Sequence, residues 1–294
     1  MESCKPMWEV ARTWLAAGLL AVSFAACPAD PPQPAERRAP AKAARAEGER
    51  GAEPPRGRAA ARGEVPAAES WGPLRVRRLG DGDGPVVVLL HGFGAEGDDL
   101  VGLARGLKVP EGTRFVLPEA PVDLPRRGRA WWRIDRGELL RARVTGRPRD
   151  LSNREPEGLA EARRAMLRML SEASRRLEVP VSEMVLAGFS QGAMAAMDAA
   201  LHASEAPAAV AVLSGAPLAM GRWEPRLGRL RGVPVLVTHG RGDRLLSFEA
   251  AERLAHELEA AGAEVAFVPF QGGHAIPPSV RSRLAGLIDR VAAD

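Results

Sequence analysis

The strongest constraint on the fold is an alternation of short apolar runs with longer helical stretches. The short runs occupy residues 85–90, 115–117, 184–187, 208–213, 233–238 and 265–268. Continuous apolar runs of this length are typical of strands buried on both faces. Helical spacing is found at 157–177, 191–202, 248–261 and 279–292. Since strands that alternate with helices form right-handed βαβ units, we predict an α/β fold with a mainly parallel central sheet flanked by helices and no large lid.

Composition excludes several classes of protein. The chain has 294 residues, of which 46% are hydrophobic and 27% charged, which is typical of a globular domain and unlike a disordered or multi-span membrane chain. The formal net charge is only +4, with both signs interleaved, so no nucleic-acid partner is expected. Both cysteines, Cys4 and Cys27, lie near the N-terminus, so the region beyond Cys27 has no disulfide and no Cys-ligated metal.

Residues 1–27 are predicted to be a lipoprotein-type signal peptide. Lys5 and Arg12 are followed by a 13-residue apolar run over 14–26, which is too short for a membrane-spanning helix and ends in small residues before Cys27. This pattern resembles a bacterial lipobox, so we expect lipidation of Cys27. The protein would then be a membrane-anchored lipoprotein of the cell envelope, facing the periplasm or the exterior. Simple secretion and an uncleaved anchor are the alternatives.

A tether and one folded domain are expected after the signal peptide. Residues 28–70 consist mainly of Pro, Ala, Arg, Glu and Gly, with almost no large apolar side chain to bury. We therefore predict a disordered spacer over this range, followed by one folded α/β domain over 71–294.

The most informative motif is Gly-Phe-Ser-Gln-Gly at residues 188–192. It follows an apolar run and precedes an Ala/Met-rich helix, so Ser190 is expected on a sharp strand-to-helix turn that flanking glycines make possible. The helix N-terminus at this turn favours developing negative charge. Ser190 is thus a candidate nucleophile, with the alternative of a plain structural turn.

A nucleophilic serine needs a base, and the base needs a carboxylate. Asp243 and His274 both follow predicted strands, and both lie in glycine-containing loops at the carboxyl ends of those strands. We predict them as the acid and the base, in the chain order Ser, Asp, His. His239 is the rival base, but it is expected to brace the turn before Asp243.

The oxyanion hole requires two N–H donors. We expect one to be the backbone N–H of Gln191, directly after the serine. The other is expected from the glycine-rich loop at residues 91–94, with the backbone N–H of Phe93 as the candidate. His91 in the same loop is expected to hold it by hydrogen bonds rather than to act in catalysis.

The ordered segments LLHGFGAEGDDL, FVLPEAPV, RAWWRID, LAGFSQGAMAAM, LSGAPL, HGRGD and FQGGHAIP resemble one known family. It is the phospholipase/carboxylesterase family of α/β-hydrolases, which includes acyl-protein thioesterases and small bacterial carboxylesterases. The resemblance extends from about residue 74 to the C-terminus. It implies that Ser190, Asp243 and His274 match the nucleophile, acid and base, and that Phe93 and Gln191 match the oxyanion hole.

The resemblance also implies a role for Trp131 and Trp132, which match an aromatic segment near the acyl-binding side. Contact with substrate and plain packing are both open for this pair. Two positions depart from the family pattern. Arg241 stands where relatives often carry Asp, and residues 245–247 read Leu-Leu-Ser where relatives have a proline.

These observations lead us to expect a serine hydrolase that cleaves carboxylic esters or thioesters of short to medium acyl chains. The substrate would be a small molecule, the acyl group would be carried on Ser190, and no metal or organic cofactor would be needed. The alternatives are a tethered, non-catalytic binding lipoprotein on the same fold and a serine peptidase.

Overall fold

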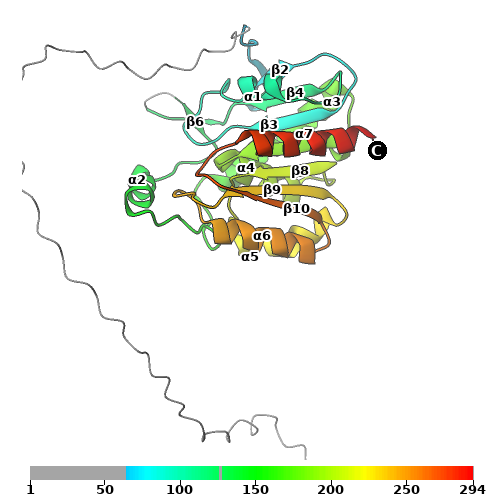
Figure 1. The fold of residues 1–294 in the computed structure, drawn as a ribbon. Helices are drawn as coiled ribbons and strands as arrows, with labels where there is room; N and C mark the ends of the chain where they lie inside the picture. Colours follow the sequence, from blue (N-terminus) through cyan, green and yellow to red (C-terminus); the bar gives the residue numbers. More distant parts are fainter. Residues whose placement is uncertain (1–63, 126–127, 294) are drawn as a thin grey trace, which may run out of the picture. The chain divides into compact units, whose positions relative to one another are not determined.

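The computed structural model describes residues 64–125 and 128–293 (Figure 1). The predicted signal peptide, Cys27 and most of the predicted tether lie outside these residues. Within the described ranges, no helix is long and apolar enough to cross a membrane.

The domain is built on an eight-stranded sheet with the spatial order β1-β2-β4-β3-β7-β8-β9-β10. In that order the strands are β1 (Glu69–Trp71), β2 (Leu74–Leu79), β4 (Arg114–Pro118), β3 (Val86–Leu90), β7 (Met184–Phe189), β8 (Ala209–Leu213), β9 (Pro234–Gly240) and β10 (Glu264–Phe270). The pairs from β4 to β10 are parallel, whereas β1–β2 and β2–β4 are antiparallel. The expected mainly parallel sheet is confirmed.

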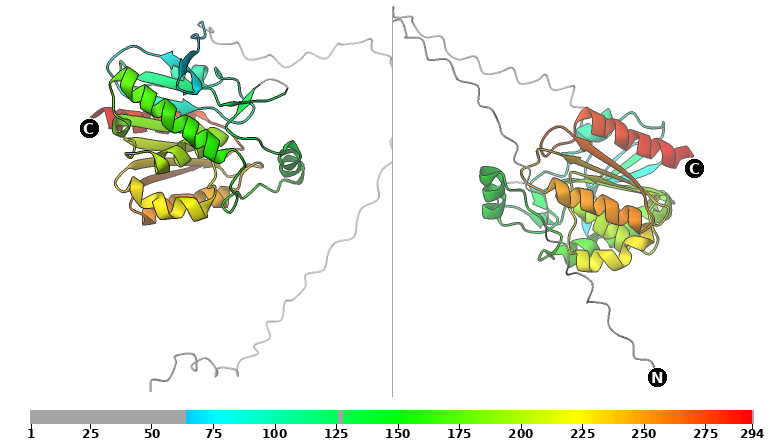
Figure 2. Two further views of the ribbon diagram at one scale, coloured as in Figure 1. Left: turned by 180° about the vertical axis from the view of Figure 1, so that it is seen from behind. Right: turned by 60° about the horizontal axis from the view of Figure 1, so that its bottom comes forward.

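Helices cover both faces of this sheet. Helices α1 (Val101–Gly106) and α7 (Pro278–Ala293) share one hydrophobic cluster, and α3 (Leu159–Leu177), α4 (Gln191–His202) and α6 (Phe248–Ala260) share the other. The rear view in Figure 2 shows α3 crossing the face opposite α7. Strand β3 contributes to both clusters because successive side chains of a strand point to opposite faces of the sheet. Val88 packs in the cluster of α3, α4 and α6, and Leu89 packs in the cluster of α1 and α7.

The chain reverses its direction of sheet growth at β3. After β3 it adds β4 on one side, and β7 then pairs with the other side of β3. In open α/β sheets, ligands bind beyond the carboxyl ends of the strands at such a switch point. The loops after β3 and β7 are therefore where chemistry is expected.

The folded region begins before the predicted boundary at residue 71. Strand β1 starts at Glu69 and pairs Glu69 with Val76, so its first two residues fall within the predicted tether. The cause is Trp71, which is fully buried and ties the strand to the core. A short antiparallel edge hairpin of this kind lacks a continuous apolar run, so the composition of residues 28–70 did not reveal it.

Smaller elements lie between the main ones. They are β5 (Val122–Asp123), β6 (Arg129–Ala130), α2 (Arg136–Thr145), the 3₁₀ turn η1 (Val181–Glu183), α5 (Met220–Trp223) and η2 (Glu224–Leu230). Strands β5 and β6 form a separate antiparallel ribbon. Helix α2 stands apart from the sheet at one end of the domain (Figure 1).

A buried ion pair fixes the helix that follows the candidate serine. Asp198 on α4 is 1% exposed and accepts two hydrogen bonds from Arg163 of α3, at 2.6 and 2.8 Å. The indole N–H of Trp223 also donates to Asp198, at 2.8 Å. Because all three groups are hydrogen-bonded, the charge is compensated, and α4 is tied to α3 and α5.

Candidate active site

Ser190 lies at the junction of β7 and α4 in a strained backbone conformation, with φ 56° and ψ −119°. A positive φ is unfavourable for a residue with a side chain and persists only where its surroundings hold it. Here the N–H of Ser190 donates to the carbonyl of Leu213 at 2.9 Å. Its own carbonyl accepts from the N–H groups of Ala193 and Met194, at 3.1 and 3.2 Å. The turn is therefore held from both sides.

The glycines of the motif permit this turn by close approach. A Cβ added at Gly188 would lie 2.4 Å from the carbonyl carbon of Gly192. A Cβ added at Gly192 would lie 2.3 Å from the carbonyl oxygen of Leu90, at the end of β3. Both contacts involve main-chain atoms, so a side chain at Gly188 would push the start of α4 away from β7, and one at Gly192 would push it away from the end of β3.

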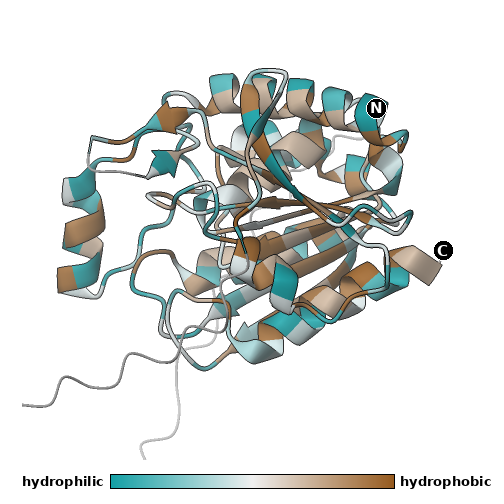
Figure 3. Cartoon of the chain, turned by 90° about the horizontal axis from the view of Figure 1, so that it is seen from above, coloured by the Kyte–Doolittle hydropathy of each residue, from teal (hydrophilic) through white to brown (hydrophobic). Residues whose placement is uncertain are grey.

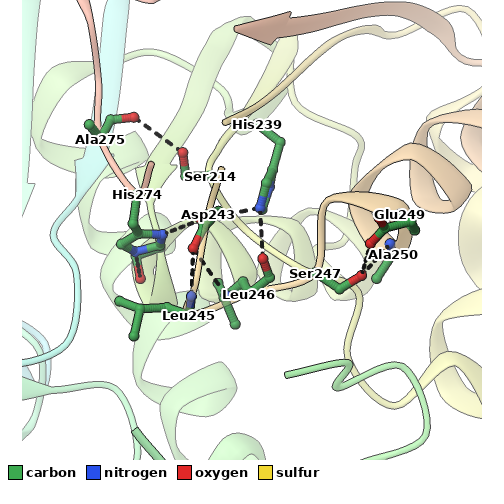
Figure 4. Close-up of polar contacts among 11 residues, drawn as sticks. Ser214, His239, Asp243, Leu245, Leu246, Ser247, Glu249, Ala250, His274 and Ala275 are labelled. Atoms are coloured by element: carbon green, nitrogen blue, oxygen red, sulfur yellow. Dashed lines mark hydrogen bonds and ion pairs between the residues drawn. The ribbon is translucent and has the colours of Figure 1, made fainter. Parts of the chain in front are cut away.

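The structure brings the three predicted catalytic side chains into one hydrogen-bonded line. His274 Nε2 lies 2.7 Å from Ser190 Oγ, and His274 Nδ1 lies 2.7 Å from Asp243 Oδ2. The imidazole also packs against the ring of Phe189, with 4.9 Å between ring centroids. Figure 4 shows the carboxylate of Asp243 between His274 and His239.

Four donors surround the carboxylate of Asp243. Its Oδ1 accepts the backbone N–H groups of Leu245 and Leu246, at 2.8 and 3.1 Å. Its Oδ2 is contacted by His274 and also by His239 Nε2, at 3.2 Å. Burial alone would raise the pKa of Asp243, but the hydrogen bonds from His239 and His274 outweigh burial and hold the pKa well below its ordinary value. The acid is therefore ionised at neutral pH.

His239 has the bracing position that the sequence predicted. It is fully buried, and its Nε2 also lies 3.3 Å from the carbonyl oxygen of Leu246. Both neighbours of Nε2 are acceptors, so this nitrogen carries the proton. Its Nδ1 is buried without a hydrogen-bond partner among the described residues. Sequence position alone, four residues before Asp243, was the available indication of this contact.

Main-chain hydrogen bonds join the loops that carry Asp243 and His274. The N–H of Gly242 donates to Gly272 at 2.8 Å, and a Cβ at Gly240 would lie 2.3 Å from the carbonyl oxygen of Gly273. On the other side of the His274 loop, Ser214 Oγ donates to the carbonyl of Ala275 at 3.2 Å (Figure 4). Ser214 was not predicted from the sequence, in which its only indication is the segment LSGAPL after a strand.

The loop that was predicted to supply an oxyanion donor lies against the serine. A Cβ added at Gly92 would be 3.3 Å from the Cβ of Ser190. The backbone N–H groups of Phe93 and Gln191 have no acceptor among the residues that the structure describes. Two N–H groups beside a nucleophile and without protein acceptors are the arrangement that an oxyanion hole requires.

His91 holds this loop, as expected. Its Nδ1 lies 2.9 Å from the carbonyl of Gly92, and its Nε2 accepts the N–H of Ala120 at 3.0 Å. Burial lowers the pKa of His91. The imidazole is therefore neutral, with the proton on Nδ1, and links the loop after β3 to the loop after β4.

The tryptophan pair separates into two situations. Trp131 is 1% exposed, and its indole N–H donates to the carbonyl of His91 at 3.0 Å, which favours packing. Trp132 is 2% exposed and lines a cavity of about 320 Å³ together with Met194, one turn beyond Ser190. The side chain of Gln191 bridges the pair, because its Oε1 accepts the N–H of Trp131 at 2.9 Å and its Nε2 donates to the carbonyl of Trp132 at 2.8 Å. This role of the Gln191 side chain was not predicted from the sequence.

The mainly parallel sheet, the strained serine turn and the Ser–His–Asp line together define an α/β-hydrolase. The chain matches the family model of the phospholipase/carboxylesterase proteins over residues 74–288. It therefore belongs to the phospholipase/carboxylesterase family and is a carboxylesterase-type hydrolase.

Solved structures agree with this fold. The esterase PE8 is 24% identical and covers 74% of this chain and 99% of its own, with a TM-score of 0.61. A carboxylesterase from Mesorhizobium loti is 19% identical and covers 76% of this chain and 98% of its own, with a TM-score of 0.60. The Bacillus cereus carboxylesterase is 21% identical and covers 74% of this chain and 94% of its own, with a TM-score of 0.57.

Proposed function

We propose that this protein is a serine hydrolase that cleaves carboxylic esters or thioesters of short to medium acyl chains through an acyl-enzyme on Ser190. The observation that carries the proposal is the line from Ser190 Oγ through the imidazole of His274 to the carboxylate of Asp243, with 2.7 Å at each step. These are the separations over which a base takes a proton from a serine hydroxyl.

The proposed reaction has two halves. His274 Nε2 accepts the proton of Ser190 as Oγ attacks the acyl carbonyl, and the backbone N–H groups of Phe93 and Gln191 stabilise the oxyanion. The imidazolium then gives its proton to the leaving alcohol or thiol. In the second half, His274 takes a proton from water, which attacks the acyl-enzyme, and the proton returns to Ser190 Oγ as the acid is released.

Asp243 supports both halves by charge and orientation. Its lowered pKa keeps the carboxylate ionised, so it stabilises the imidazolium whenever His274 holds the extra proton. It also accepts from Nδ1, which leaves Nε2 free to act as the base. Since the carboxylate has three other donors, it does not need to move during turnover.

The cavity beside Trp132 is the proposed acyl site. Its volume is about 320 Å³. Its apolar lining residues are Trp132, Ile134, Leu151, Pro156 and Met194, and its charged lining residues are Arg133, Asp135, Glu138, Arg149, Arg154, Glu155 and Glu157. This volume is at the lower end for small-molecule sites. It supports acyl chains of short to medium length, and it gives Trp132 a role in substrate contact.

We further propose that the protein is anchored in the cell envelope by lipid on Cys27, with secretion as the alternative. The sequence pattern before Cys27 supports this placement. Radiolabelled palmitate incorporated by the wild-type chain but not by Cys27→Ser is the expected result, and equal incorporation would exclude lipidation at this residue.

Ser190→Ala is the direct test of the catalytic proposal. Hydrolysis of p-nitrophenyl butyrate should fall by about 10⁶-fold, as when the nucleophile of a comparable triad is removed. Ser282→Ala, at an exposed position on α7, is the matched control and should retain full activity. A fluorophosphonate probe should label wild type and Ser282→Ala but not Ser190→Ala.

The outcomes discriminate among the alternatives. Unchanged turnover in Ser190→Ala would refute the proposal. Failure of the probe to label folded wild type would favour a non-catalytic binding protein, and faster cleavage of peptide amides than of esters would favour a peptidase. A series of esters and thioesters from acetyl to dodecanoyl then measures the acyl-length preference.

A further inference from the structure

Helix α2 has an outward face whose apolar side chains are left in solvent. The helix begins after Asp135, whose carboxylate accepts the N–H of Gly137 at 2.8 Å, and it buries only Ala142. Leu140 is 62% exposed and Val144 is 77% exposed. They are the most exposed large hydrophobic residues that the structure describes. Leu140 and Val144 are four residues apart and so lie on the same face.

Arginines share this face, and carboxylates do not. With 3.6 residues per turn, Arg136 and Arg143 lie along one side of Leu140 and Val144, and we call these four residues the α2 outer face. Arg141 lies on the other side of the pair, where it contacts Asp135 at 3.7 Å. Neither Arg136 nor Arg143 has an ion-pair partner within the described residues. Glu138 lies on the opposite side of the helix, where it pairs with Arg154 at 2.9 Å.

Helix α2 lies beside the cavity that contains Trp132, with its outer face on the side away from that cavity. Glu138 on the inner side of α2 lines the same cavity as Trp132 and Met194. Figure 1 shows α2 standing off the domain, and Figure 3 shows brown and teal bands alternating along the same helix at the left. A surface that bound the outer face of α2 would therefore lie near the substrate cavity.

We propose that the α2 outer face docks onto an anionic lipid surface. Aliphatic side chains beside arginines suit a bilayer interface, because Leu140 and Val144 can enter the acyl region while the guanidinium groups reach the phosphates. This inference goes beyond the hydrolase activity and does not depend on Ser190.

Two features of the surface argue against protein partners. A symmetric contact with a second copy would place the arginines of one outer face against those of the other, which is electrostatically unfavourable. The face also carries no aromatic side chain, whereas the energetic centres of protein interfaces are enriched in Trp and Tyr. Because only two aliphatic side chains enter the lipid, the contact should be weak and reversible, and a lipid on Cys27 would strengthen it by raising the local concentration.

The test uses the full-length chain with both native cysteines replaced by serine and a single new cysteine, Val144→Cys, labelled with nitrobenzoxadiazole. Vesicles of phosphatidylglycerol and phosphatidylcholine should shift the emission to the blue, and 0.5 M NaCl should reverse the shift. Arg283→Cys, labelled on exposed α7, is the control position and should not respond. Thermal unfolding of each labelled protein establishes that it is folded.

A charge variant sharpens the test. Arg136→Gln with Arg143→Gln should weaken the vesicle response by roughly 30-fold, since each Arg contributes about 1 kcal/mol near an anionic membrane. Arg168→Gln with Arg283→Gln, exposed positions on α3 and α7, is the matched control and should leave the response unchanged.

Three results would overturn the proposal. They are an unresponsive label at residue 144, an equal response at residue 283, and an unchanged response in the Arg136/Arg143 variant. A shift that appears without vesicles and grows with protein concentration would instead indicate self-association through α2.

Discussion

A methyl group at Gly192 tests how closely the serine turn is fitted to the end of β3. The added Cβ of Gly192→Ala would lie 2.3 Å from the carbonyl oxygen of Leu90 and 2.5 Å from that of His91. Both distances are about 1 Å short of ordinary van der Waals contact. Because both oxygens belong to the main chain, rotation of a side chain cannot relieve the clash, and α4 must move away from the loop after β3.

That movement separates the two halves of the proposed site. Ser190 and the N–H of Gln191 belong to the α4 side, whereas the N–H of Phe93 belongs to the β3 side. A displacement of about 1 Å at reacting groups can cost about 10²-fold in rate. Overpacking of this kind also costs about 1–3 kcal/mol of stability, or roughly 2–4 °C in Tm for each kcal/mol in a domain of this size.

The assay compares kcat/KM for p-nitrophenyl butyrate with urea unfolding of the same samples. Gly286→Ala is the control, because the described part of the chain places no heavy atom within 4 Å of its added Cβ, apart from its own helix. It should raise helix stability by about 0.5–1 kcal/mol and leave turnover unchanged. Wild-type turnover in Gly192→Ala would refute the argument that close main-chain packing positions the serine.

Three further predictions concern the supports of the site. Asp198→Ala should lower the unfolding free energy in urea by about 3 kcal/mol, because it leaves the partly buried guanidinium of Arg163 and the buried indole N–H of Trp223 without their partner, while turnover per folded molecule is preserved. His239→Phe removes one hydrogen bond to Asp243 and should raise the pKa of that carboxyl. In wild type the lowered pKa means that ionised Asp243 stabilises the folded state at pH values above about 3.9, the pKa of Asp in the unfolded chain, and this stabilisation is lost as pH falls toward the folded-state pKa. The variant should therefore be less stable at neutral pH and show a shallower loss of Tm below about pH 4, and an identical pH profile would contradict the role of His239. Gln191→Leu keeps the backbone N–H of residue 191 but leaves the N–H of Trp131 and the carbonyl of Trp132 without their hydrogen-bond partner. It should lower the free energy of unfolding by about 1–3 kcal/mol and raise KM for esters whose acyl group contacts Trp132.

The parallel core of the fold could be predicted because its strands are buried on both faces. The runs at residues 85–90 and 184–187 coincide with β3 and the first part of β7, and the helical spacing at 157–177 overlaps α3. Strand β2, which lies between β1 and β4, was missed because it reads LRVRRL, in which buried Leu74 and Val76 alternate with arginines. Helix α2 was missed because it has no apolar face toward the core, so hydrophobic periodicity does not reveal it.

The relative positions of Ser190, Asp243 and His274 followed from the rule that the carboxyl ends of parallel strands meet at one edge. The contacts that hold them did not follow from sequence. Ser214 and the side chain of Gln191 act on loops that are distant along the chain, through bonds to Ala275 and Trp132. Such contacts depend on how loops from different strands pack, and no local pattern encodes that packing.

The family departures after Asp243 become understandable from the same contacts. The carboxylate is held by the backbone N–H groups of Leu245 and Leu246, so the side chains at these positions do not determine where the acid lies. Ser247, in the segment where relatives have a proline, accepts the N–H of Ala250 at 3.1 Å and so begins α6 as an N-cap. A proline near this point would begin the helix by its fixed φ instead. Different side chains can thus satisfy the same two requirements, a pair of free N–H groups for the acid and a defined start for the next helix.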